Sequence, residues 1–204
     1  ATRFLVGGCM LVALLASSSV WAQAVKLEPA DAQDKVFYGN DDRIDVFEET
    51  DPQRIDWARS TCALVFASDL TEESNGLITL ATTPYEVFGF PACDDEPFKD
   101  QPTAGFCTGF MVGQDLIATA GHCISDEIDL ARTAFVFGFE MLDEDVANTE
   151  FLPSQVYFGV ELVDQALGGA LDHAIIRVDR PITAPGAEMI PVRREGDTEF
   201  GDVV

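Results

Sequence analysis

The sequence predicts an all-β domain in which short strands form a sandwich or a barrel. From Ser60 onward, brief runs rich in β-branched and aromatic residues follow one another, and turn signals separate them. Helical periodicity is weak throughout, with at most short turns near residues 54–59 and 122–125. The 204 residues are 47% hydrophobic and 24% charged, so the chain can bury a core and wholesale disorder is not expected.

Residues 1–24 have the form of a secretory signal peptide. Arg3 precedes the apolar run Phe4–Ala16, and Ala22–Ala24 matches an A-x-A cleavage site. The alternative of a membrane anchor is disfavoured, because about 13 apolar residues fall short of the roughly 20 that span a bilayer. Cys9 lies inside the run and away from the cleavage point, so no lipid anchor is expected. We therefore expect a secreted protein, extracellular or periplasmic, with no membrane attachment after the signal is removed.

Export also sets the expected state of the cysteines. Cleavage of the signal peptide removes Cys9 and leaves four cysteines, an even number in an oxidising compartment where disulfides persist. The spacing of these four lacks C-x-x-C pairs, and the chain has only two histidines, so no zinc site or His-rich metal centre is expected. The residues concerned are Cys62, Cys93, Cys107, Cys123, His122 and His173.

The net charge argues against broad contact with nucleic acid or an anionic membrane. The chain has 36 Asp and Glu against 12 Lys and Arg, a formal net charge of −24, whereas such contacts depend on basic side chains that neutralise phosphates. Acidic clusters at 94–96, 126–129 and 143–145 could bind calcium. None has EF-hand spacing, and charge runs usually form solvated loops, so no metal is expected.

The chain up to about Arg59 is polar and contributes little core, with turn signals at 28–29, 39–42 and 51–52. Strands are expected beyond it. The runs 133–141 and 155–163 are the strongest, and they are candidates for a neighbouring pair. The full set of predicted strands is 62–67, 76–82, 106–112, 116–120, 133–141, 155–163 and 174–178.

A hairpin is expected over residues 106–123, with its turn at 113–115. Cys107 and Cys123 enclose 15 residues (108–122), and a bond between them would close the base of the hairpin. In the loop-closure model such a bond removes unfolded-state entropy equivalent to roughly 3 kcal/mol. Cys62 and Cys93 could form a second bridge that closes about 30 residues, or could stay free thiols; the bridge is the favoured interpretation.

The candidate catalytic residues are His122 and Asp172. A lone histidine is more often structural, but here an acidic residue stands at the start of the apolar strand 171–179. A serine hydrolase needs an imidazole to take the hydroxyl proton, and a carboxylate to fix the tautomer and stabilise the imidazolium. His122 and Asp172 could fill these roles. His173 would point to the opposite face of the strand and is expected at the surface or an interface.

These residues lie in motifs that resemble the trypsin/chymotrypsin-like serine peptidases. Thr119-Ala-Gly-His-Cys123 resembles the catalytic-histidine signature of that family, and Asp172-His-Ala-Ile175 resembles its aspartate motif, in the same order along the chain. The separation of Cys107 and Cys123 fits the disulfide found there in the family. Val36-Phe-Tyr-Gly-Asn-Asp-Asp-Arg43 is similar to the mature amino terminus of secreted bacterial glutamyl endopeptidases.

The resemblance covers about residues 36–204 and implies both a fold and an activity. It implies a trypsin-like fold, with a first antiparallel β-barrel over about 56–192 and a linker and the start of a second barrel at 193–204. Residues 25–35 would be a short propeptide, and its removal would expose Val36. The implied activity is that of a monomeric, secreted serine endopeptidase that needs no cofactor and cleaves protein or peptide substrates, after acidic residues if the glutamyl resemblance holds.

The family pattern also calls for a serine in Gly-x-Ser-Gly-Gly, and no serine of this chain has that setting. We expect the chain to be truncated before that serine, which would lie on the second barrel, and to be inactive by itself. Two alternatives stay open. One is an inactive trypsin-fold binding module, and the other is a plain secreted β-domain stapled by disulfides, in which His122 is structural.

Overall fold

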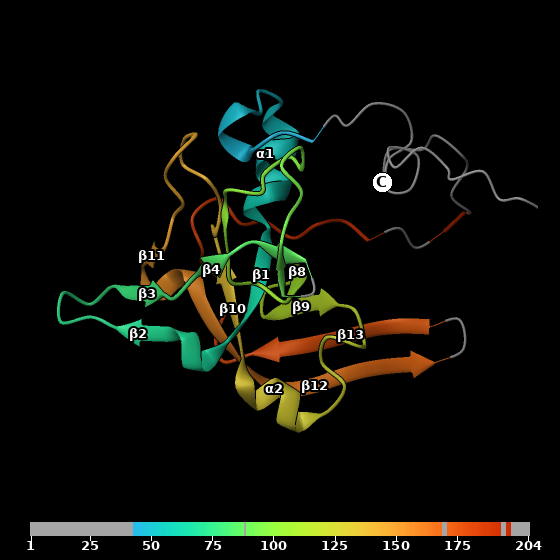
Figure 1. The fold of residues 1–204 in the computed structure, drawn as a ribbon. Helices are drawn as coiled ribbons and strands as arrows, with labels where there is room; N and C mark the ends of the chain where they lie inside the picture. Colours follow the sequence, from blue (N-terminus) through green and yellow to red (C-terminus); the bar gives the residue numbers. More distant parts are fainter. Residues whose placement is uncertain (1–42, 88, 169–170, 193–194, 197–204) are drawn as a thin grey trace, which may run out of the picture. The chain divides into compact units, whose positions relative to one another are not determined.

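The computed structural model describes residues 43–87, 89–168, 171–192 and 195–196 (Figure 1). Four predictions lie outside the described residues: the signal peptide at 1–24, the propeptide at 25–35, the amino terminus at Val36 and, apart from 195–196, the segment 193–204. None of the described helices is both long and apolar enough to cross a membrane.

Six antiparallel strands close into a barrel, which confirms the predicted all-β class. Side chains of the last barrel strand alternate between core and surface. Ala174, Ile176 and Val178 are buried and the residues between them are more exposed. The order around the barrel is β1 (Thr61–Phe66), β10 (Thr133–Phe137), β12 (Val156–Gly168), β13 (Leu171–Val178), β9 (Leu116–Thr119) and β8 (Cys107–Gly113).

The two strongest predicted strands are neighbours in the structure. β10 pairs with β12, and Phe135 lies opposite Tyr157. β12 continues to Gly168, past the predicted end, because β13 folds back along it and places His173 opposite Ala166. Figure 1 shows β12 and β13 as the long orange hairpin. This hairpin, together with β9, is the frame on which the candidate site is built.

Between β1 and β8 the chain makes a long excursion of small elements. Leu70–Glu72 (β2) and Ile78–Leu80 (β3) form a sheet with Glu150–Phe151 (β11), in the order β11-β3-β2. Two further ladders are short. The described residues also include three single turns of 3-10 helix, of which one precedes α1, one follows β1 and one follows β11. These are β4 (Thr83–Pro84) with β7 (Pro102–Thr103), β5 (Glu86–Val87) with β6 (Phe90–Pro91), and η2 (Val46–Glu48), η3 (Ala67–Asp69) and η4 (Pro153–Gln155).

Two short α-helices in the described part of the chain flank the barrel strands. α1 (Pro52–Arg59) begins at the predicted Asp51-Pro52 turn signal, where the Asp51 side chain accepts a hydrogen bond from the Gln53 N–H and proline occupies the first turn. α2 (Glu127–Arg132) was not predicted. Its six residues bury only Leu130, too little to produce a recognisable helical pattern, and it forms where Asp126 accepts hydrogen bonds from two backbone N–H groups.

The core has two parts, one on each face of the barrel wall. Leu64, Phe135 and Tyr157 belong to one cluster, and the alternate residues Val65 and Val156 belong to the other, which also contains residues of β3 and β11. Every residue of β10 is buried because both of its faces are covered. This explains why β10 is apolar without a break from Ala134 to Phe137, in place of an alternating pattern.

The predicted Cys62–Cys93 bridge is wrong, since both thiols are free. Cys62 lies on β1, two residues before Leu64, and therefore points into the same core; only 2% of it is exposed. Cys93 lies exposed on the acidic loop. A sulfur enclosed in the barrel core cannot reach a loop on the surface. Burial also raises the pKa of the Cys62 thiol, which keeps it protonated and unreactive.

Candidate active site

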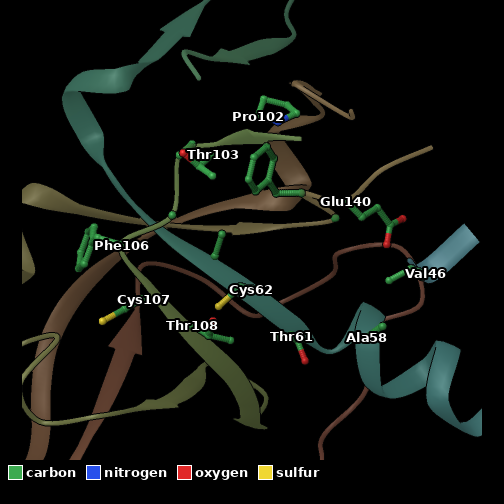
Figure 2. A pocket seen from close by; sticks show the side chains of 15 residues that line it. Val46, Ala58, Thr61, Cys62, Pro102, Thr103, Phe106, Cys107, Thr108 and Glu140 are labelled. Carbon is green, nitrogen blue, oxygen red and sulfur yellow. The ribbon is translucent and has the colours of Figure 1, made fainter. Parts of the chain in front are cut away.

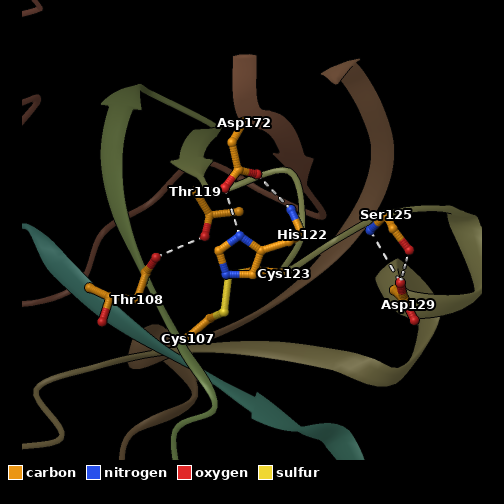
Figure 3. The surroundings of a disulfide bond; sticks show 8 residues. All are labelled: Cys107, Thr108, Thr119, His122, Cys123, Ser125, Asp129 and Asp172. Atoms are coloured by element: carbon orange, nitrogen blue, oxygen red, sulfur yellow. Dashed lines mark hydrogen bonds and ion pairs between the residues drawn. A yellow bond between two sulfur atoms is a disulfide. The ribbon is translucent and has the colours of Figure 1, made fainter. Parts of the chain in front are cut away.

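The barrel brings His122 and Asp172 together although 50 residues separate them in the chain. β9 and β13 are antiparallel neighbours, with Thr119 opposite Ala174. The turn that follows Thr119 therefore lies beside the residues that precede Ala174. His122 is in this turn and Asp172 is the second residue of β13, so the pairing of the two strands sets their separation (Figure 3).

One carboxylate holds His122 at two points. The ring Nδ1 lies 2.7 Å from Asp172 Oδ2, and the backbone N–H of His122 donates to Asp172 Oδ1 at 2.9 Å. An ionised carboxylate can only accept hydrogen bonds, so the proton of this contact belongs on Nδ1. Nε2 of the neutral ring is then left with its lone pair free to take a proton. The two contacts fix both the tautomer and the position of the ring.

The pKa of Asp172 is lowered from its ordinary value. The hydrogen bond from the His122 ring is the largest cause, and the hydrogen bond from the His122 backbone N–H is the second. A carboxyl whose pKa is depressed in the folded state stabilises the fold above its ordinary pKa of 3.8, and this contribution is lost as the pH falls through the depressed value. Asp172 is therefore ionised at neutral and mildly acidic pH, as an orienting carboxylate must be.

Gly121 lets the turn approach the two hairpin strands closely. A Cβ at this position would lie 2.4 Å from the carbonyl oxygen of Ala166 and 2.9 Å from that of His173, and both of these atoms are backbone. No side chain fits there without moving a strand away. Close packing thus explains why glycine stands before His122. The sequence alone shows this glycine only as part of the motif.

We predict that Gly121→Ala weakens the His122–Asp172 contact and lowers the free energy of unfolding by about 1–3 kcal/mol, because the added methyl group pushes the turn off β12 and β13. The downfield proton resonance of the Nδ1–H should shift or disappear. Gly76→Ala is the control for the resonance alone: a Cβ at Gly76 meets nothing within 4 Å, but its φ of +82° strains an alanine, so this variant loses stability by a different cause. The control should retain the resonance, and an unaltered resonance in Gly121→Ala would contradict the steric account.

A disulfide anchors the same turn from the other side. Cys107, the first residue of β8, is bonded to Cys123, with the two Cα atoms 6.1 Å apart. This is the pairing expected from the hairpin and from the family resemblance. Beside it, the Thr119 hydroxyl donates to the carbonyl oxygen of Thr108 at 2.8 Å (Figure 3). The disulfide thus joins β8 to the turn that contains His122, and the hydrogen bond joins β8 to the end of β9.

The neighbourhood of His122 does not favour a metal ion. Among the described residues, Cys107, His122 and Cys123 bring possible ligand atoms within 4.8 Å of one another. The two sulfurs are bonded to each other, so neither can act as a thiolate ligand. Two of the acidic clusters considered for calcium use carboxylates locally: Asp126 caps α2, and Asp143 accepts hydrogen bonds from the backbone N–H groups of Asp145 and Val146 in its own loop.

His173 lies on the hairpin surface, as predicted. Its Nε2 is 3.2 Å from Asp164 Oδ2, and both side chains are well exposed. The two histidines of the chain therefore have separate carboxylate partners. Only His122 has a second hydrogen bond from its backbone to the same carboxylate.

No described serine hydroxyl is hydrogen-bonded to His122. The Ser60 hydroxyl is buried against the carbonyl oxygen of Asp56 and the N–H of Glu188, and the Ser125 hydroxyl bonds to Asp129. The His122 side chain is 63% exposed. The described residues thus supply an oriented, accessible imidazole and its carboxylate, but no nucleophile in contact with them.

Comparison with known proteins gives a family match. The family model for trypsin matches residues 98–199, half of the chain. The matched segment includes the strands β8 to β13, and with them both cysteines of the disulfide, His122 and Asp172. No curated protein matches the chain.

Proposed function

Because the chain belongs to the trypsin family, we propose that it carries the histidine and aspartate of a secreted serine endopeptidase. The observation that carries the proposal is the double attachment of His122 to Asp172, through the ring at 2.7 Å and the backbone at 2.9 Å. A surface histidine needs neither contact. A general base needs the first for its tautomer and gains a fixed position from the second.

In the proposed reaction, Nε2 of His122 takes the proton of a serine hydroxyl while the serine oxygen bonds to the substrate's carbonyl carbon. The resulting imidazolium gives this proton to the nitrogen of the leaving peptide, the carbon–nitrogen bond breaks, and an acyl-enzyme remains. Water then bonds to the acyl carbon while Nε2 takes its proton, the bond to the serine oxygen breaks, and the imidazolium returns the proton to serine as the acid is released. Asp172 stays ionised throughout and stabilises the imidazolium, in agreement with its lowered pKa.

The serine and the oxyanion donors belong to a second barrel in this proposal. The resemblance to the trypsin/chymotrypsin-like peptidases supports it, since that family carries its nucleophile in Gly-x-Ser-Gly-Gly, which we place beyond Val204. The exposed edge of the His122 ring leaves room for a hydroxyl to approach. The 204 residues alone would then lack peptidase activity.

Secretion and maturation are part of the same proposal. The apolar run and the A-x-A site support export and cleavage after Ala24, and the Cys107–Cys123 disulfide suits an oxidising compartment. Removal of residues 25–35 would give a mature protein that begins at Val36. The similarity of residues 36–43 to glutamyl endopeptidases supports cleavage of substrates after acidic residues.

Hydrolysis of matched peptides by the full secreted protein tests the proposal. The peptides are identical except for the residue before the cut, which is Glu, Gln, Lys or Leu. We expect the Glu peptide to be cut with the highest kcat/KM, with Gln as its uncharged control. Preference for the Lys or Leu peptide would contradict the acidic specificity but would still support peptidase activity. If the protein cuts none of the four peptides and also leaves a denatured protein substrate intact, the result would favour the inactive binding module.

A further inference from the structure

A cavity of about 500 Å³ opens beside β1, away from the contact between His122 and Asp172. The start of β1, the segment 102–108 and the turn 138–140 after β10 line it (Figure 2). Small residues such as Ala63 and Gly105 leave the space, while Phe139 contributes an apolar wall. The volume is within the range of protein cavities that bind ligands.

Glu140 is the acidic residue of this cavity, and it has an unusual environment. Its side chain is half-buried, yet no hydrogen bond or ion pair to its carboxylate forms among the described residues. Burial raises the pKa of Glu140, and the charge of Arg59 opposes this more weakly. Arg59 itself lies 3.8 Å from Asp56. A half-buried carboxylate without a partner is stabilised by any cation that reaches it.

One end of the cavity lies near the candidate active site, and the other end holds Glu140. In Figure 2, Glu140 and Val46 lie at one end of the cavity, and Phe106 and Cys107 lie at the other. Cys107 is bonded to Cys123, the residue after His122. A peptide that passes His122 can therefore continue over the disulfide and along the cavity to Glu140.

The end near the disulfide is apolar and exposed. Phe106 stacks on Phe66 with the ring centroids 4.9 Å apart, and the two side chains are 39% and 51% exposed. Exposed aromatic pairs beside a cavity are typical of surfaces that bind another chain. The cavity thus offers apolar contacts at one end and a single negative charge at the other.

We propose that this cavity binds a basic segment of a protein substrate, with a lysine or arginine side chain paired to Glu140 and apolar neighbours on Phe139 and Phe106. The net charge of −24 attracts basic segments, which adds charge complementarity on the scale of the whole molecule. That the segment belongs to a substrate rests on the proposed function; the binding itself does not.

The test is a titration of the full chain with two peptides, acetyl-Phe-Ala-Lys-Ala-amide and the same peptide with norleucine in place of lysine, which lacks only the ammonium group. We expect the lysine peptide to bind about tenfold more tightly. Amide chemical shifts should change at 104–106 and 138–140. Glu140→Gln should remove the difference between the peptides. Glu144→Gln, an exposed residue of the same loop with the same charge change, should retain it.

Three results would overturn the proposal: no binding of the lysine peptide at millimolar concentration, equal affinity of the two peptides, or equal effects of Glu140→Gln and Glu144→Gln. The measurement needs no turnover, so its failure is distinct from failure of the proposed peptidase activity. If the protein cleaves peptides but binds the two probes equally, the proposed peptidase function stands and the proposed binding of a basic segment is excluded.

Discussion

His122→Ala in the full protein is expected to lower kcat/KM for peptide hydrolysis by about 10⁶-fold. The effect is large because a serine hydroxyl is a poor nucleophile until a base removes its proton, and Nε2 of His122 is the proposed base. The same ring later protonates the leaving nitrogen, so both chemical steps lose their proton carrier. Secretion and folding should be retained, since the His122 side chain is mostly exposed.

The second histidine of the chain provides the control. His173 also contacts a carboxylate, that of Asp164, but lies on the surface of the hairpin. His173→Ala should change kcat/KM by less than about twofold, because it removes only an exposed contact. Near-normal hydrolysis by His122→Ala, or equal losses in the two variants, would exclude the catalytic role of His122.

Asp172→Asn is expected to lower kcat/KM by about 10⁴-fold while it preserves the shape of the site. An asparagine amide can donate to Nδ1, and the ring proton then belongs on Nε2, where it blocks the base. The imidazolium also loses the negative charge beside it. Asp164→Asn, on the same hairpin, is the matched control and should leave hydrolysis unaltered.

A double variant distinguishes orientation from an independent effect of Asp172. Residues that act as one unit do not show additive losses, so His122→Ala with Asp172→Asn should be no worse than His122→Ala alone. Losses that multiply would mean that Asp172 contributes to catalysis without His122. This would contradict the hydrogen-bonded geometry from which its role is inferred.

Local sequence predicted most of the barrel because its strands are short, apolar and separated by turns. The β8–β9 hairpin and the pairing of β10 with β12 were both expected from composition and spacing. The length of β12 was not, since its last residues are exposed and are held as a strand by pairing with β13. α2 was missed for a similar reason, because a helix with one buried residue has no periodic pattern.

The candidate site was predictable in its residues but not in its geometry. His122 and Asp172 were identified from their motifs, whereas the second hydrogen bond from the His122 backbone and the close contact of Gly121 depend on how two distant strands pair. The Cys62–Cys93 bridge was predicted from an even count of cysteines, which contains no information on the face of the strand that carries each sulfur. Alternation with Leu64 could have placed Cys62 inside the core.

The carboxylate of Glu140, which has no hydrogen-bond or ion-pair partner among the described residues, could not have been predicted from the sequence. In the linear chain it is one of 36 acidic residues, and it stands next to Phe139 after a strand, as many surface acids do. Its burial arises from segments near residues 46, 102 and 140 that meet only in the fold. Sites of this kind are found from packing and charge together.

Labelling with an active-site-directed fluorophosphonate tests most directly the central claim that the His122–Asp172 pair activates a serine. The reagent reacts with a serine hydroxyl only where a base takes its proton, so its site reports the nucleophile. We predict one labelled serine in the full protein, located by peptide mass analysis beyond Val204, and loss of this label in His122→Ala but not in His173→Ala. Label on one of the chain's own serines, or label that persists in His122→Ala, would contradict the account.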